Sequence, residues 1–469
     1  MDRDAPVDER FADGRVFLTG LFEPVEDERD DADLEVEGEI PPQLDGLFVR
    51  NGPNPRFEPI DGYHPFDGDG MLHGVYLQDG RARYRNRWVR SKGLQAEMAR
   101  GRALFGGFGG WVPPDPEVVA EVGPMKNTAN TNVVRHSGRI FALMEAAPPT
   151  EIDWELETIG ECDFGGRLEG PMTAHPRIDP VDGEMHFFGY WPMPPYLRYH
   201  VVDPAGELVH STVIDIPAPV MIHDFVLTED YAVFLDAPAV FDLHGLLAGG
   251  KPLRWEPDRG TRIGVLPRGA EGSQIRWFEV ENGYVVHFFN AFSEGGVVEV
   301  HGPRFEEMPT GFELGPRPED PVPLPWKWTI DLDSGKVVEE QTDETPGEFP
   351  RINEALMCRR HRYGYMCIAR DWGFDLDFCG VAKSDIRTGT TVRHLYEEHE
   401  VCGEHVFVPD PEGSAEDDGW LMSFVVDRRD RSTDLVILDA RDLGADPVAR
   451  VHIPRRVPIG FHAAWIPRA

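Results

Sequence analysis

The sequence predicts an all-β protein built as a β-propeller, and three observations lead to that prediction. Short runs rich in Val, Ile, Phe and Tyr alternate with turn residues along almost the whole chain. Glycine (49 residues) and proline (42) are abundant, which favours turns over long helices. Hairpin-like units recur without helices between them, as in radial repetition of small sheets. A pair of large β-sandwiches is the alternative, and the pattern does not give the number of blades.

The individual elements follow from local patterns. The clearest strand candidates are Arg139–Glu145, Glu184–Trp191, Tyr231–Asp236, Tyr284–Phe289, Trp420–Asp427 and Asp434–Asp439. The best helix candidate is a short one near Leu94–Leu104. Four hairpins are expected where a strand ends in Asp and a Gly-containing turn follows, because Asp caps such turns and Gly adopts positive φ. These units begin at Arg177, His200, Trp328 and Ala382.

The chain contains no Gly/Ser linker or low-complexity tract, so one domain over residues 1–469 is expected, with residues 1–30 as a peripheral lead-in. Its 83 acidic and 46 basic residues give a formal net charge of -37. Binding to nucleic acid needs a basic surface, so nucleic acid is not expected as a partner. Nothing in the sequence predicts the oligomeric state.

The five cysteines form no CxxC pair, and reduced thiols in the core are expected rather than disulfides. The N-terminal MDRDAPVDER is too polar for a signal peptide, and no apolar run reaches the length that spans a bilayer. A cytoplasmic protein is therefore expected.

One segment departs from the general acidity. Residues 81–102 contain eight basic side chains against the single Glu97, and a Gly-rich stretch with aromatic residues follows. Its apolar side chains are Leu104, Phe105, Phe108 and Trp111. Cations beside exposed aromatics predict a tunnel mouth with peripheral membrane contact. The alternative is that the arginines line one face of a strand and the aromatics are buried.

Four of the 17 histidines have apolar, strand-like surroundings: His175, His223, His287 and His462. A histidine in such a stretch needs partners for both ring nitrogens, and a metal with a second acceptor is one solution. Their spacing matches no local metal motif, so the four could converge only through the fold. A propeller permits this, because successive blades present their inner strands to one axis.

Several motifs in order resemble one family. The run FVRNGPNPRFEP from Phe48 is followed by FDGDGMLH from Phe66, NTANTNVV from Asn127, EFPRINE from Glu348 and the closing RVPIGFHAAW. Together with the four histidine contexts, they resemble the carotenoid cleavage oxygenases from about residue 30 to the end of the chain.

The resemblance implies a seven-bladed β-propeller with a cap of loops and short helices over an axial Fe(II). It places the four histidines at the iron and Glu145, Glu348 and Glu404 as acceptors for the imidazoles. It also implies that Phe66 faces the substrate and that Thr131 lies near an open coordination site. The implied reaction uses O₂ to cleave an electron-rich alkene into two carbonyl products.

The substrate is less sharply indicated. Relatives that cleave phenolic stilbenes or isoeugenol have a Lys before the first of these glutamates and a Tyr that binds the phenol, whereas this chain has Met144 and Trp88 there. An apolar pocket suited to a carotenoid or apocarotenoid is therefore expected. The stretch Ile263–Trp277 and the ending FHAAWIPR favour the alternative, a stilbene or phenylpropene. A second alternative is a non-catalytic carotenoid-binding propeller.

Overall fold

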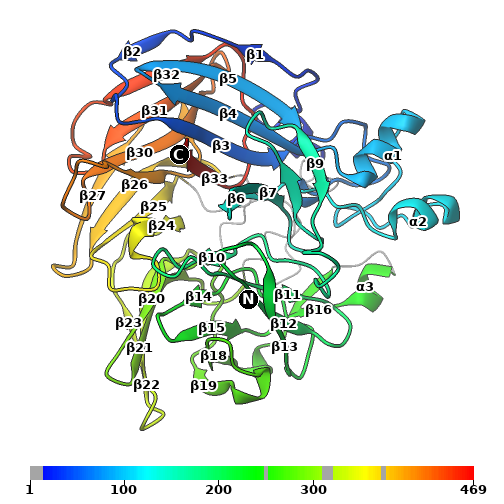
Figure 1. Ribbon diagram of the computed structural model, residues 1–469, viewed down its shortest axis with the longest axis vertical. Coiled ribbons are helices and arrows are strands. Elements are labelled where there is room, and N and C mark those ends of the chain that lie inside the picture. The colour runs from blue at the N-terminus through cyan, green and yellow to red at the C-terminus, as the bar shows by residue number, and fades with distance from the viewer. Residues whose placement is uncertain (1–13, 248–251, 309–320, 371–375, 469) are drawn as a thin grey trace.

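The computed structural model describes residues 14–247, 252–308, 321–370 and 376–468. In Figure 1 these residues form small antiparallel sheets arranged around an axis, and the hydrogen-bonded sheets divide into seven blades. The prediction of an all-β, seven-bladed propeller is confirmed.

The first four blades follow the chain, apart from the strands that close the ring. Blade 1 contains β33 (Ala463–Pro467), β3 (Gly46–Pro53), β4 (Gly70–Gln78), β5 (Arg81–Trp88) and β1 (Asp30–Asp31). Blade 2 contains β6 (Asn132–His136), β7 (Arg139–Leu143), β8 (Thr150–Ile152) and β9 (Thr158–Glu161). Blade 3 contains β10 (Arg177–Ile178), β11 (Met185–Tyr190), β12 (Leu197–Val202) and β13 (Leu208–Ile214). Blade 4 contains β14 (Val226–Leu227), β15 (Tyr231–Asp236), β18 (Thr261–Pro267) and β19 (Arg276–Val280).

The remaining blades complete the ring. Blade 5 contains β20 (Asn290–Glu294), β21 (Val297–Arg304), β22 (Leu324–Asp331) and β23 (Val337–Gln341). Blade 6 contains β24 (Glu348–Arg351), β25 (Tyr363–Ala369), β26 (Phe378–Asp385) and β27 (Thr390–Leu395). Blade 7 contains β29 (Val406–Pro409), β30 (Gly419–Asp427), β31 (Thr433–Asp439), β32 (Ala449–Ile453) and β2 (Val36–Gly38). The strand β28 (Glu400–Cys402) pairs with both β26 and β30 and so joins blades 6 and 7.

Strands from opposite ends of the chain close the propeller. The late strand β33 pairs with β3 of blade 1, and the early strand β2 pairs with β32 of blade 7. The described part of the predicted lead-in is anchored, because Val25 is buried and exchanges two hydrogen bonds with the Asn54 side chain.

The local predictions are largely confirmed. All four predicted hairpins are present, and a glycine with positive φ stands in each turn: Gly183, Gly206, Gly335 and Gly389. The predicted helix is α1 (Lys92–Arg100), which ends at Gly101 with φ of 69°. The predicted strand Tyr284–Phe289 is wrong: only Tyr284 forms a bridge, and β20 begins at Asn290. The chain there turns inward and directs His287 toward the axis.

The other elements are short. They are α2 (Pro116–Val122), α3 (Leu243–Leu247), the strand pair β16 (Ala239–Phe241) and β17 (Leu253–Trp255), and the 3₁₀ turns Arg15–Leu18, Pro65–Asp67, Pro257–Arg259, Gly272–Gln274 and Glu354–Leu356. In Figure 1, α1, α2 and α3 lie at the edge of the ring. None of the helices in the described part of the chain combines the length and the apolar character of a membrane-spanning segment. All five cysteines are free, as expected, and four are buried.

Candidate metal centre

Each of the four histidines lies just before the innermost strand of a blade. His175 precedes β10, His223 precedes β14, His287 precedes β20 and His462 precedes β33. The segment leading into each inner strand therefore delivers one imidazole to the axis. This arrangement accounts for the long, irregular spacing of the four residues in sequence.

The four imidazoles form one buried cluster. One ring nitrogen from each lies within 4.8 Å of one from every other, and all four residues are buried. The Nε2 atoms of His175 and His223 are 3.1 Å apart, and those of His223 and His287 are 3.0 Å apart. The predicted set is thus brought together with its Nε2 atoms converging.

Each of the three predicted glutamates contacts one of these imidazoles at Nδ1. Glu145 contacts His223, Glu348 Oε2 lies 2.6 Å from Nδ1 of His287, and Glu404 Oε1 lies 3.1 Å from Nδ1 of His462. An imidazole that donates from Nδ1 to a carboxylate presents the lone pair of Nε2 on its other side. The carboxylates therefore fix both the tautomer and the orientation.

In this tautomer the Nε2 lone pairs face one another, and the cluster is suited to bind a cation. At the 3.0 Å separation between the Nε2 atoms of His223 and His287, two lone pairs face each other. A cation between the nitrogens turns that repulsion into coordination, and neutral imidazole is a good ligand for divalent transition metals. Burial, and then the neighbouring imidazoles, hold the pKa of His175 well below its ordinary value. Burial likewise lowers the pKa of His462 to about 4, so both rings stay neutral.

The buried charges point to a divalent ion. Arg351 donates from Nε and Nη2 to the two oxygens of Glu404, at 2.9 and 3.0 Å, and so balances that carboxylate. Among the described residues, no Lys or Arg pairs with Glu145 or Glu348, which leave two negative charges beside the imidazoles. Buried charges are stable when paired or bound to metal, and a divalent cation balances these two. Burial opposes protonation of His223, but Glu145 outweighs it and raises the pKa of His223, so a metal bound at its Nε2 would take the place of a proton.

Two residues of the EFPRINE motif complete the site in ways the sequence did not predict. The Phe349 ring lies 5.1 Å from His287 and 4.8 Å from His462, measured between centroids. Its φ of 53° is unusual for a bulky residue, and its N–H donates to Glu348. Arg351, two residues on, balances Glu404. The motif itself was the available signal, but neither role could be assigned from it.

A cavity of about 340 Å³ reaches this cluster. His175, His287, His462 and Glu404 contribute to its wall, together with residues of the inner strands β6, β10, β24 and β33. The imidazole cluster therefore borders free space inside the ring.

The predicted pocket residues fall at different distances from the histidines. Phe66 packs on Phe461, the neighbour of His462, with centroids 5.5 Å apart. The carbonyl of Thr131 accepts a hydrogen bond from the N–H of His462 at 3.1 Å, while its hydroxyl donates to Asn130. Thr131 thus fixes the backbone at His462, and its predicted effect on small-ligand access stays a prediction.

The two positions linked with phenol binding carry no available polar group. The Met144 sulfur accepts from the N–H of Thr128 at 3.2 Å. The Trp88 indole N–H donates to the carbonyl of Asn54 at 3.0 Å, and its ring packs with Val25, Met71 and Leu94. The described contacts place Trp88 in that small core cluster and do not link it to the imidazoles.

The residues predicted to form the tunnel mouth, 104–111, lie in a loop that hydrogen bonds hold in place. Leu104 and Phe105 are buried, whereas Phe108 is exposed and Trp111 half-buried. The Asp67 carboxylate accepts from the N–H groups of Phe108 (2.8 Å) and Gly109 (2.9 Å). A Cβ on Gly107 would lie 2.0 Å from Asp67 Oδ1, so glycine is required for this close approach.

The basic segment beside this loop is not a free cationic surface. Every one of its eight cations has an acidic partner: Arg81, Arg83, Arg85, Arg87, Arg90, Lys92, Arg100 and Arg102. The arginines of β5 lie on one face of the strand, as the alternative interpretation held. Because these charges are paired, they offer little attraction for anionic lipid. Membrane contact through Phe108 and Trp111 stays a prediction.

Comparisons with known proteins agree with this geometry. The family model described as RPE65, retinal pigment epithelial membrane protein, matches residues 22–467. The carotenoid 9,10(9',10')-cleavage dioxygenase of Crocus sativus is 36% identical over 96% of this chain and 89% of its own. The isoeugenol monooxygenase of Pseudomonas nitroreducens is 33% identical over 96% of this chain and 98% of its own.

Solved structures are equally similar. The lignostilbene dioxygenase of Pseudomonas brassicacearum superposes with a TM-score of 0.90 at 30% identity, covering 96% of this chain and 98% of that one. Cobalt-substituted apocarotenoid oxygenase from Synechocystis gives 0.85 at 30% identity, covering 95% and 97%.

Proposed function

The chain belongs to the RPE65 family of carotenoid cleavage oxygenases, and from that premise we propose that it is a non-haem Fe(II) dioxygenase. It cleaves one C=C bond of a carotenoid or apocarotenoid with O₂ and gives two carbonyl products. The observation that carries the proposal is the buried group of four imidazoles with converging Nε2 atoms. Imidazole binds several transition metals, so the choice of iron rests on the family.

His175, His223, His287 and His462 hold the iron, and Glu145, Glu348 and Glu404 orient three of these ligands. Bound Fe(II) supplies the centre at which O₂ becomes reactive toward an electron-rich alkene. The protein fixes which bond lies over the metal and keeps water away, and both tasks fall to the apolar side chains around it. Phe349 packs on two of the imidazoles, and Phe66 with Phe461 forms an apolar wall beside His462.

A polyene substrate is supported by the two positions that would otherwise bind a phenol. Met144 offers only a thioether, and the N–H of Trp88 is already used by Asn54. A site built to bind a hydroxyl strongly favours substrates that have one, and neither position provides that recognition. The second candidate, cleavage of a stilbene or phenylpropene, is favoured by the similarity to lignostilbene dioxygenase and isoeugenol monooxygenase.

Parallel incubations distinguish these substrates. The iron-loaded protein is given an apocarotenal, resveratrol or isoeugenol, and the aldehydes are identified by mass spectrometry, with His287→Ala as the control. Cleavage of the polyene supports the proposal. Vanillin or 4-hydroxybenzaldehyde alone, with the polyene intact, replaces it with the second candidate. Stoichiometric iron without oxygen uptake on any alkene indicates a non-catalytic binding protein.

A further inference from the structure

Arg50 on β3 is a buried cation that has no partner among the described residues. The residue is 8% exposed, and its Nε is buried with no hydrogen bond. Within the described residues its side chain makes neither a hydrogen bond nor an ion pair. Arg351, also largely buried, has the Glu404 carboxylate as its counter-charge. Burying an unpaired guanidinium is costly, so the position of Arg50 calls for an explanation.

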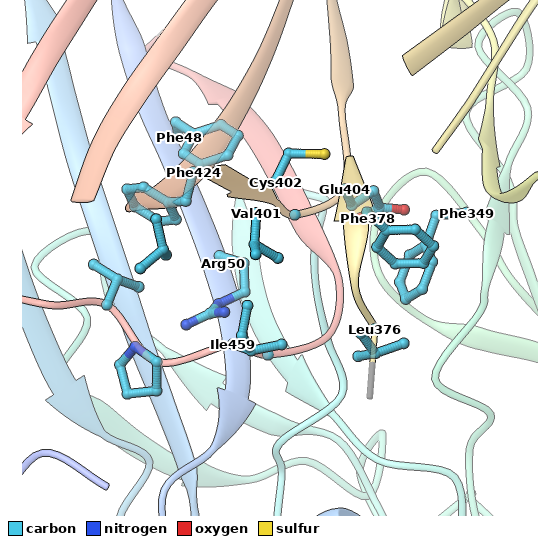
Figure 2. Close-up of a pocket in the computed structure, with 15 residues that line it drawn as sticks. Phe48, Arg50, Phe349, Leu376, Phe378, Val401, Cys402, Glu404, Phe424 and Ile459 are labelled. Atoms are coloured by element: carbon cyan, nitrogen blue, oxygen red, sulfur yellow. The ribbon is translucent and has the colours of Figure 1, made fainter. Parts of the chain in front are cut away.

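The guanidinium lines a small, partly open cavity where blades 1, 6 and 7 meet (Figure 2). Figure 2 shows it beside Val401 and Ile459, below Phe424, with Glu404 farther off. Strands β3, β28 and β30 and the loop 457–460 enclose it. A Cβ on Gly460 would lie 2.4 Å from Nη1 of Arg50, so glycine lets the backbone pack against the guanidinium without displacing it. The backbone of the loop therefore packs directly against the cation.

The acidic group in the same wall is not available to Arg50. Both oxygens of Glu404 already accept hydrogen bonds, from Arg351, from His462 and from the N–H of Ala463. Among the described residues, the rest of the wall consists of apolar side chains, the Cys402 thiol and backbone groups. Burial lowers the pKa of Arg50 only to about 10, so the side chain is still charged at neutral pH.

The size of the cavity restricts what can supply the missing negative charge. Its free volume is about 20 Å³, which accommodates one particle about the size of a water molecule. A carboxylate on a substrate or a phosphate needs more room. We propose that this cavity binds a single small monovalent anion, chloride, held by the Arg50 guanidinium.

The inference does not depend on the proposed reaction. Two of the residues that line the cavity, Phe349 and Glu404, also contact His462. One layer of side chains therefore separates the anion from the imidazole cluster, and occupancy of the cavity fixes the wall against which His462 packs.

Bromide replaces chloride as a probe that can be located directly. Crystals of the full chain grown in sodium bromide should show an anomalous scattering peak in the cavity beside the Arg50 guanidinium. A cavity that contains water, or bromide confined to the protein surface, would overturn the proposal.

Unfolding in solution provides the second test. For a single anion site in the native state, each tenfold rise in chloride above the dissociation constant lowers the unfolding equilibrium constant about tenfold. Gluconate of equal ionic strength, too large for the cavity, serves as the reference salt. Equal stability of the wild-type protein in the two salts over this range contradicts a chloride site.

Arg50→Met keeps an unbranched side chain of similar length and removes the charge. It should abolish the difference between chloride and gluconate while leaving the fold intact. Arg81→Met is the matched control, because it removes a largely exposed arginine from the same sheet and should keep that difference. A chloride effect that persists in Arg50→Met contradicts the assignment. If that variant does not fold, the bromide map of the wild-type protein decides.

Discussion

Glu348 and Glu404 both accept from a histidine of the metal centre, yet replacement of each by glutamine should have different consequences. Glu404 receives hydrogen bonds on both oxygens, and every partner is a donor. A glutamine amide NH₂ at this position faces donors only, whichever way it is turned. Glu348 uses Oε2 for His287 and for the N–H of Phe349, while its Oε1 has no hydrogen-bond partner in the part of the chain that the structure describes. Glutamine at 348 can place its NH₂ at that free position.

The magnitudes follow from these contacts. Glu404→Gln leaves buried donors unsatisfied and removes the buried counter-charge of Arg351, leaving only the exposed Glu354, which should destabilise the metal-free protein by about 3 kcal/mol. Glu348→Gln replaces a charge-assisted hydrogen bond with a neutral one, a loss of about 1 kcal/mol. Its main effect should be on iron affinity, because loss of a partner that orients a ligand lowers metal affinity by roughly 10- to 100-fold.

Two assays separate these effects. Urea unfolding of the metal-free variants measures the fold, and competition with a chromophoric chelator measures iron affinity. Glu354→Gln is the matched control, because Glu354 pairs with the same Arg351 but is 61% exposed. That surface pair is worth less than about 1 kcal/mol. If metal-free Glu348→Gln is as unstable as Glu404→Gln, or Glu404→Gln is as stable as the wild-type protein, the reasoning fails.

Three further predictions concern other parts of the molecule. His287→Ala should retain at least tenfold less iron after gel filtration, because one of four ligands is lost. The iron content is measured by mass spectrometry, and retention equal to that of the wild-type protein would refute the ligand assignment. Asp67→Asn replaces one of two acceptors that hold the loop of Phe108 and Gly109, so hydrogen exchange of these amides should rise while exchange in the blades stays unchanged. Asp179→Asn should cost about 3 kcal/mol at pH 7, because this buried carboxylate bridges Arg268 and Arg359.

The last variant also makes a prediction about pH. Burial opposes ionisation of Asp179, but Arg359, the N–H of Val181 and Arg268 outweigh it and lower its pKa. A carboxyl group with a lowered native pKa stabilises the fold above its ordinary value of 3.8 and loses that contribution as the pH falls below it. The difference in urea midpoint between the wild-type protein and Asp179→Asn should therefore shrink below about pH 4. A constant difference from pH 7 to pH 3 contradicts this.

The sequence predicted best those features that depend on neighbouring residues, such as the hairpin turns. Asp and Gly at the four hairpin turns act within a few residues, and all four turns formed. The run Tyr284–Phe289 has strong strand propensity, yet it does not continue as a strand. Tertiary context outweighs propensity there, because His287 must reach the axis.

Contacts between residues far apart in the sequence could be predicted only through the family resemblance, and some could not be predicted at all. The convergence of the four histidines depends on ring closure by β3 and β33, which no spacing in the sequence encodes. The EFPRINE motif identified Glu348, but the roles of Phe349 and Arg351 depend on contacts between blades. Arg50 lies within the signature FVRNGPNPRFEP, and its lack of a partner among the described residues appears only in the folded structure.

Ring closure also sets the order in which the centre can assemble during translation. His175, His223 and His287 emerge on successive blades, whereas His462 emerges with β33, the strand that pairs with β3 and completes blade 1. A nascent chain interrupted before that strand lacks both the fourth imidazole and the contact that joins the ends of the ring. Coordination by all four imidazoles is therefore available only to a chain whose synthesis has passed residue 462.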